Sequence, residues 1–251
     1  MVRVDFSNPF VAGHFPVWLQ SHQKHLKQVQ ASLGKWAAAS RQKEAAQSAS
    51  GTTRRPPRDL AVVFDIDEII LCNIRAASAE SGFSVESHFP PPETLPDGCN
   101  LGPPTSLKSW PKDPVWLHLT ASRTGFNPMY PGAGELLAEC CSLGLTVYLV
   151  TGRNEALRAE TITNFEILGL LGHHTGLDRA NLSADGDRLH MVPPEMTKHG
   201  TTPPMRPYKE AVRAKISERH RLVANIGDQI SDLGYHGDVQ CLIPHAYYTT
   251  H

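Results

Sequence analysis

The chain lacks any long hydrophobic run and any marked excess of charge of one sign. Although 40% of its 251 residues are hydrophobic, none of its apolar runs approaches the roughly 18 residues that a membrane-spanning helix needs. The formal net charge is −1, so no overall electrostatic field attracts nucleic acid or an anionic membrane. We therefore expect neither nucleic acid nor a membrane among its partners.

Cysteine is scarce, and its spacing matches no metal-binding pattern. The five cysteines include the neighbours Cys140 and Cys141, and an odd number in this arrangement favours reduced, partly buried thiols in a cytoplasmic protein. The first residues contain no basic segment followed by an apolar one, so no secretory signal is visible. A cytoplasmic location is therefore expected, with a secreted or periplasmic one as the alternative if a signal peptide was removed.

Two aspartates separated by one residue follow an apolar run. The run covers residues 60–64, and Asp65 and Asp67 come directly after it. A fully apolar run of this length indicates a strand buried on both faces of a parallel sheet, and open α/β folds bind ligands at the carboxyl edge of such a sheet. Because two neighbouring carboxylates repel each other and lose hydration, the pair requires a cation, a proton or both.

Three further polar motifs follow, each at the end of an apolar run or at the start of an expected helix. They are Thr151, Gly152 and Arg153 after the run 145–150, Lys209 at the start of a helix over 208–220, and Asp228 and Asp232 after the run 222–226. Strands are also expected over 189–192 and 239–243, and helices over 134–143 and 154–168. This alternation of strands and helices predicts a doubly wound α/β sheet.

In this order, the four motifs resemble those of the haloacid dehalogenase (HAD) superfamily. The wording around them, such as residues 131–136 and 227–233, resembles its acid phosphatase branch, subfamily IIIB, which includes class B enzymes and plant vegetative storage proteins. The resemblance implies a three-layer, Rossmann-like α/β domain with a central parallel five-stranded sheet in the order 3-2-1-4-5. The strand before Asp65 would then be central and would lie beside the strand before Asp228.

The resemblance also implies a Mg²⁺-dependent phosphomonoester hydrolase that acts on a small phosphorylated metabolite through an aspartyl-phosphate. Asp65 would be the nucleophile, and Asp67 would protonate the leaving group and then activate water. Thr151 and Gly152 would bind phosphoryl oxygens, and Lys209 would neutralise the charge that develops in transfer. Arg153 would either contact the substrate or pair with a nearby acid.

The expected metal ligands are oxygen atoms, as Mg²⁺ prefers. They are the side chains of Asp65 and Asp228 and the backbone carbonyl of Asp67. Asp232 would hold the metal through water or orient Lys209.

Two alternatives to hydrolysis remain at this stage. An alcohol that outcompetes water would make the protein a phosphotransferase, and a chain that keeps the fold without the chemistry would be a binding or storage protein. The presence of Asp65 argues for catalysis. Hydride or methyl transfer is not expected, because no Gly-x-Gly-x-x-Gly follows any expected strand.

Residues 1–58 are expected to form a helical extension with a linker, and residues 59–251 the phosphatase core. Within the extension a helix over 16–47 carries an apolar seam that includes Leu19, Leu26 and Leu33. The seam either packs on its own domain or forms a homodimer contact.

The core contains a Pro-rich insertion over about 73–127, which is expected to shape the pocket entrance, with a loop of no function as the alternative. Four aromatic residues would either stack on a substrate or belong to the core: Trp110, Trp116, Phe126 and Tyr130.

Overall fold

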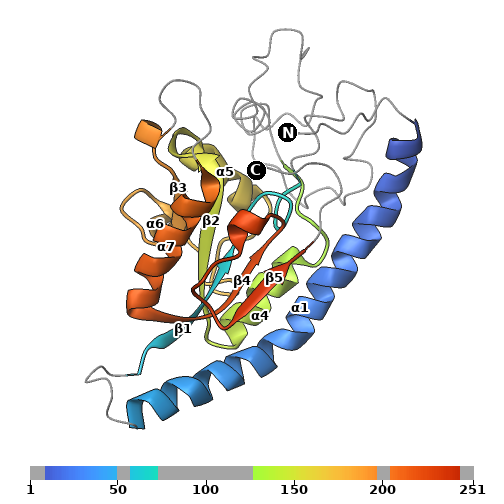
Figure 1. Ribbon diagram of the computed structural model, residues 1–251. Helices are drawn as coiled ribbons and strands as arrows, with labels where there is room; N and C mark the ends of the chain where they lie inside the picture. Colours follow the sequence, from blue (N-terminus) through green and yellow to red (C-terminus); the bar gives the residue numbers. More distant parts are fainter. Residues whose placement is uncertain (1–8, 50–56, 73–126, 197–203, 244–251) are drawn as a thin grey trace.

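The computed structural model of the protein describes residues 9–49, 57–72, 127–196 and 204–243 (Figure 1). The expected insertion therefore lies outside the described residues, apart from its last position, Asn127. Of the four aromatic residues named above, only Tyr130 is described, and it is fully buried in the core.

A parallel sheet of five strands forms the centre of the fold, in the order β3-β2-β1-β4-β5. The expected sheet and its order are therefore confirmed. The strands are β1 (Asp59–Phe64), β2 (Thr146–Asn154), β3 (Leu189–Val192), β4 (His220–Gly227) and β5 (Val239–Leu242). Every residue of β1 except the first is buried, as a central strand covered on both faces requires.

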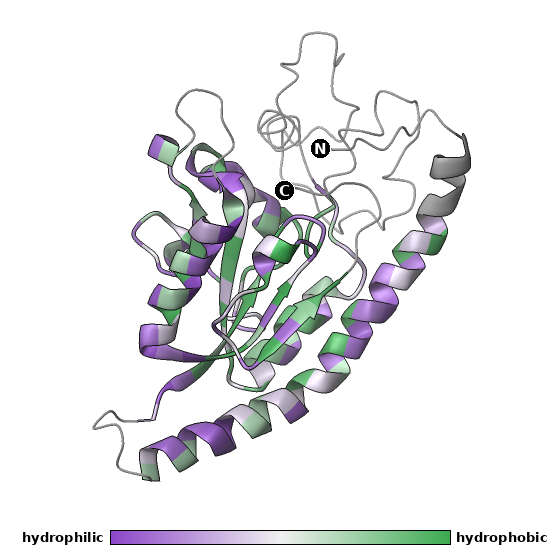
Figure 2. Ribbon diagram, in the orientation of Figure 1, coloured by the Kyte–Doolittle hydropathy of each residue, from purple (hydrophilic) through white to green (hydrophobic). Residues whose placement is uncertain are grey.

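Helices cover both faces of this sheet and give three layers (Figure 1). They are α1 (Pro9–Ala49), α4 (Ala133–Ser142), α5 (Arg158–Ile167), α6 (Arg179–Leu182) and α7 (Met205–Arg219), with short 3₁₀ helices η3 (Glu155–Leu157) and η5 (Ile230–Asp232). Val62 and Phe64 of β1 belong to the hydrophobic cluster that includes α1 and α4, whereas Ala61 and Val63 pack with Ile216 of α7. Figure 2 shows the hydrophobic strands between these helices.

Several element boundaries differ from the sequence prediction. Helix α1 begins at Pro9 and contains Pro16, where a start was predicted because proline removes a backbone hydrogen bond inside a helix. Strand β2 continues through its polar motif to Asn154. The Asn154 side chain then accepts a hydrogen bond from Ala156 N at 2.9 Å, so this residue caps η3, and α5 begins only at Arg158. Helix α7 begins at Met205, before the predicted start.

The apolar seam of α1 faces its own domain. Leu26 and Leu33 are fully buried, and Leu19 is 8% exposed, within the same hydrophobic cluster as α4 and the sheet. The seam is therefore covered by the chain itself. A homodimer through this helix stays a prediction and would have to use its other face, and the boundary at residue 58 also stays a prediction. None of the described helices is long and apolar enough to cross a membrane.

Partly buried ion pairs hold the carboxyl-terminal half of α1 against the sheet. Glu44 of α1 accepts hydrogen bonds from Arg58 at 3.1 Å, and these lower the pKa of Glu44 to about 2. Arg221 of β4 reaches Glu44 at 3.3 Å and Asp238 at 2.8 Å. Burial opposes the ionisation of Asp238, yet hydrogen bonds from Arg221, Ser40 and Lys43 lower its pKa to about 2.

These lowered pKa values predict a loss of stability in acid. A carboxyl whose pKa is lower in the folded state stabilises the fold above its unfolded pKa of about 4 and loses that contribution as the pH falls toward about 2. Replacing Glu44→Gln should therefore lower the free energy of unfolding by about 1 kcal/mol at neutral pH, measured by urea denaturation. The difference from the wild type should shrink toward about pH 2; a difference independent of pH would contradict this account.

Candidate active site

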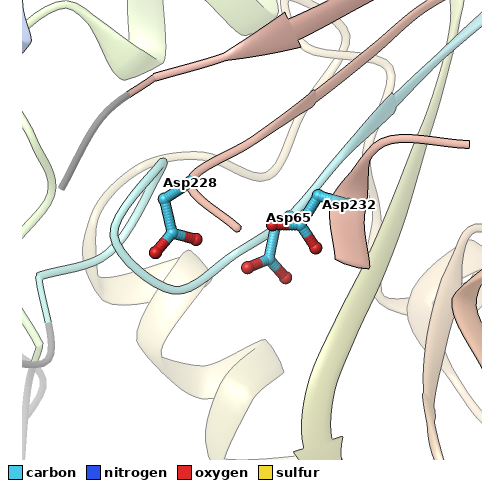
Figure 3. Close-up of side chains that lie close together, drawn as sticks. All are labelled: Asp65, Asp228 and Asp232. Atoms are coloured by element: carbon cyan, nitrogen blue, oxygen red, sulfur yellow. The ribbon is translucent and has the colours of Figure 1, made fainter. Parts of the chain in front are cut away.

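Three carboxylates meet at the carboxyl edge of the two central strands. Asp65 follows β1, and its backbone N–H donates to the carbonyl of Ile226 in β4 at 2.9 Å, so the pairing of these strands extends to the first motif. Carboxylate oxygens of Asp65, Asp228 and Asp232 all lie within 4.8 Å of one another (Figure 3). Each of the three residues is less than a tenth exposed.

Lys209 of α7 bridges two of these carboxylates, those of Asp65 and Asp232. Its side chain is 4% exposed, and its Nζ lies 3.0 Å from Oδ1 of Asp65. The same ammonium group forms an ion pair with Oδ1 of Asp232. Because Lys209 lies in the second turn of α7, the packing of this helix on the sheet brings the lysine to the carboxylates.

Asp67 faces the end of β2 and lies outside the three-carboxylate cluster. Arg153 contacts Oδ1 of Asp67 with Nη2 at 2.7 Å and with Nε at 2.8 Å, and it also donates to Thr161 at 3.1 Å. Thr151 donates to Oδ2 of Asp67 at 3.3 Å. Arg153 was expected either to contact the substrate or to pair with a nearby acid, and its side chain pairs with Asp67.

Gly152 lies in the sequence between Thr151 and Arg153, whose side chains are buried, and is itself exposed. A Cβ atom at this position would lie 3.2 Å from the sulfur of Met205 in α7, so a larger residue would crowd the start of that helix. The backbone of the motif is thus accessible at Gly152. Binding of phosphoryl oxygens by Thr151 and Gly152 stays a prediction.

The last motif is a tight loop that folds Asp232 back over Gly227. A Cβ atom at Gly227 would lie 2.0 Å from Cβ of Asp232, so only glycine fits there. Asp232 Oδ2 accepts a hydrogen bond from Gln229 N at 2.8 Å, and Gln229 Nε2 donates to Asp228 Oδ2 at 2.6 Å. The spacing of the two aspartates therefore lets both carboxylates face Asp65.

Arg213 holds this loop from α7, a role that the sequence did not predict. Its side chain is 1% exposed, and it donates to the backbone carbonyls of Ser231 and Asp232 at 3.0 Å and of Leu233 at 3.3 Å. Arg213 follows Lys209 by four residues, so both lie on one face of the helix. A second basic residue four positions after Lys209 was the sequence signal that could have predicted this role.

Glu68 also lies beside the site without having been predicted there, and it contacts Tyr130, which was predicted either to stack on a substrate or to belong to the core. Glu68 directly follows Asp67 and is fully buried, and its carboxylate accepts a hydrogen bond from the Tyr130 hydroxyl. Tyr130 is thus a core residue with a polar partner, as buried tyrosines usually are.

The charges of the site are not balanced. Burial raises the pKa of Asp65 to about 7, assisted by the charges of Asp232 and Asp67 and opposed by Lys209. Burial and the neighbouring carboxylates also raise the pKa of Asp228 well above its usual range. Lys209 remains a cation, because Asp232 and Asp65 raise its pKa more than burial lowers it.

A divalent cation fits this imbalance. If all four aspartates of the motifs are ionised, they carry four negative charges, and Lys209 and Arg153 neutralise two of them, which leaves an excess of two before Glu68 is considered. The clustered donors are all carboxylate oxygens, the ligands that hard divalent cations prefer. Asp65, Asp228 and Asp232 could therefore hold such an ion together.

One family model and two solved structures are similar to the chain. A family model described as HAD superfamily, subfamily IIIB (acid phosphatase), matches residues 15–250. The class C acid phosphatase from Bacillus anthracis is 17% identical, with a TM-score of 0.48 over 92% of this chain and 87% of that chain. Its structure with tungstate bound is 15% identical, with a TM-score of 0.44 over 93% and 86% of the two chains. None of the curated proteins compared with the chain matches it.

The family match covers all four polar motifs and nearly the whole chain. It includes the residues that the structure gathers at the carboxyl edge of β1 and β4. The chain therefore belongs to subfamily IIIB of the HAD superfamily, the acid phosphatases.

Proposed function

We propose that the protein is a Mg²⁺-dependent phosphomonoester hydrolase that passes the phosphoryl group through Asp65. Its family supports phosphomonoester hydrolysis. The observation that carries the finer proposal is the Asp65 carboxylate, buried at the sheet edge, within 4.8 Å of two other carboxylates and 3.0 Å from Lys209. A buried anion beside a fixed cation is suited to attack a phosphorus centre whose charge the site neutralises.

The reaction proceeds in two steps. A carboxylate oxygen of Asp65 forms a bond to phosphorus while the bond to the leaving alcohol oxygen breaks, and Asp67 gives that oxygen a proton. Asp67 then takes a proton from a water molecule, whose oxygen attacks phosphorus, and the bond to Asp65 breaks to release inorganic phosphate. General acid–base catalysis of this kind contributes roughly 10²–10⁴-fold.

Arg153 and Thr151 orient Asp67 for both proton transfers. The two guanidinium contacts at 2.7 and 2.8 Å and the Thr151 hydroxyl hold the carboxylate from β2. Because the guanidinium is occupied by Asp67 and Thr161, its role is positioning rather than substrate binding. When substrate binds, Thr151 turns its hydroxyl to a phosphoryl oxygen, and the exposed residue Gly152 offers its backbone N–H.

The residues that would hold Mg²⁺ are Asp65, Asp228 and the backbone carbonyl of Asp67. Once bound, the ion would neutralise the repulsion between these carboxylates and the phosphoryl group. Both carboxylate oxygens of Asp232 already accept hydrogen bonds, from Lys209 and from Gln229 N. Asp232 therefore orients Lys209 and would contact the ion through water.

The substrate is proposed to be a small phosphorylated metabolite. A cytoplasmic location stays a prediction. Transfer to an alcohol acceptor and a purely storage or binding role also stay predictions, since no contact among the described residues favours either.

Replacing Asp65→Asn tests the nucleophile. With para-nitrophenyl phosphate and Mg²⁺, kcat should fall by about 10³-fold or more, because an amide cannot form the phosphoryl intermediate. The matched control is Asp59→Asn, which makes the same change at the exposed first residue of the same strand and should retain the wild-type rate. Equal rates for the two variants would overturn the role of Asp65.

Mg²⁺ should stabilise the folded protein, and more so as the pH rises. The raised pKa of Asp65, about 7, destabilises the metal-free fold progressively as the pH rises from about 4 to about 7, because the buried carboxyl must ionise there. Bound Mg²⁺ offsets that cost, so the Mg²⁺-induced rise in Tm, measured by calorimetry, should be larger at neutral pH than in acid.

Asp228→Asn should abolish most of this rise in Tm, together with phosphatase activity. Asp185→Asn, at an exposed acid, is the control and should behave like the wild type. A Mg²⁺ effect that is equal in the two variants would show that the ion binds elsewhere. Treating the wild type with a chelator should remove its activity, and added Mg²⁺ should restore it.

A further inference from the structure

Helix α1 reaches the turn that follows the two catalytic aspartates. His22 of α1 is 1% exposed, and its Nε2 lies 2.8 Å from the backbone carbonyl oxygen of Glu68. These residues are 46 positions apart in the sequence. This hydrogen bond therefore joins the amino-terminal helix to the residue directly after Asp67.

Glu68 has a backbone conformation that needs support. Its φ is 62°, the only positive φ of a residue other than glycine in the described residues. A side chain in the left-handed region costs roughly 1–2 kcal/mol, and such residues persist where the surrounding structure holds them. The hydrogen bond from His22 is one such restraint, because it fixes the direction of the Glu68 carbonyl.

The same turn sets the direction of the Asp67 carbonyl. Glu68 N–H donates to the carbonyl of Leu71 at 2.8 Å. Because a peptide unit is planar, fixing this N–H also fixes the carbonyl of Asp67 on the other side of the same unit. The two peptide units around Glu68 are thus both held, and a change in one changes the φ and ψ angles that place the other.

The side chain of Glu68 is held by an aromatic group from the same region. The Tyr130 hydroxyl donates to Oε2 of Glu68, and the rings of Tyr130 and His22 lie 4.1 Å apart at 30°. Trp18 of α1 contacts the Tyr130 ring edge-on at 5.5 Å between centroids. Backbone and carboxylate of Glu68 are therefore restrained by two rings that pack on each other.

His22 is suited to donate rather than to carry charge. Burial lowers the pKa of His22 to about 4, so the imidazole is neutral and has one N–H. The carbonyl of Glu68 can only accept, which assigns that N–H to Nε2. The other nitrogen, Nδ1, has no hydrogen-bond partner among the described residues.

We propose that His22 and Tyr130 are positioning residues for phosphoryl transfer, which act by holding Glu68 and thereby the Asp65–Asp67 turn. Helix α1 is on this view a functional part of the active site, although none of its described residues belongs to the carboxylate cluster. The inference rests on the proposed roles of Asp65 and Asp67, and it adds that their geometry depends on a donor supplied by the amino-terminal helix.

The test compares two ways of disturbing α1. His22→Ala removes the donor, and kcat for para-nitrophenyl phosphate should fall about 10–100-fold with KM changed much less, since misplacing a catalytic group by about 1 Å can cost 10²-fold. His22→Gln supplies an amide N–H close to the position of Nε2 and should recover most of kcat. Val29→Ala, at a buried α1 position on the apolar seam, is the packing control and should lower Tm without lowering kcat.

A hydroxyl deletion gives a second, independent readout. Tyr130→Phe keeps the ring and removes the bond to Glu68, so kcat should fall and the Mg²⁺ concentration needed for half-maximal activity should rise. Tyr148 belongs to the hydrophobic cluster that includes Ile216, and its hydroxyl contacts His220. Tyr148→Phe removes that hydroxyl and should change neither kcat nor the Mg²⁺ concentration needed for half-maximal activity. Both variants keep the aromatic packing, which guards against simple misfolding.

The outcomes separate the two claims. If the wild type is active and His22→Ala has the kcat of Val29→Ala, or if His22→Gln fails to recover activity lost in His22→Ala, the inference is overturned while the proposed function stands. If Asp65→Asn is as active as the wild type, the proposed function fails and this inference fails with it. Loss of kcat in His22→Ala and Tyr130→Phe, with recovery in His22→Gln, supports the positioning role.

Discussion

The structure depends on concentrating buried negative charge at one edge of its sheet. Asp65, Asp228 and Asp232 lie within 4.8 Å of one another in a buried site, and Lys209 pairs with only two of them. Buried like charges destabilise a fold unless other groups compensate them. The raised pKa values of Asp65 and Asp228 are the consequence, and the same imbalance supports the proposal that the site binds a divalent cation.

Such a site needs rigid surroundings, and the fold supplies them from every layer. The central strand β1 is covered on both faces, and β4 lies directly beside it. From one side, α7 carries Lys209 to the carboxylates and Arg213 to the backbone of the last motif. From the other side, α1 reaches Glu68 through His22. The aspartates of the first and last motifs are therefore held by groups that lie far from them in the sequence.

The distribution of stability follows the same logic. Helix α1 is anchored at its carboxyl-terminal half by Glu44 and Arg221, and along its length by the buried seam that includes Leu26 and Leu33. This anchoring supports the proposed role of His22, which contacts the left-handed residue Glu68. The amino-terminal helix thus shares one hydrophobic cluster with the sheet and α4.

The sequence by itself determined the sheet and its four polar motifs, because apolar runs ending in charged residues are local patterns that a parallel sheet brings to one edge. Only the tertiary structure decided the pairing of Arg153 with Asp67, the clamp of Arg213 and the contact between His22 and Glu68. Those interactions join residues from separate elements, and their geometry arises only when helices and sheet pack together.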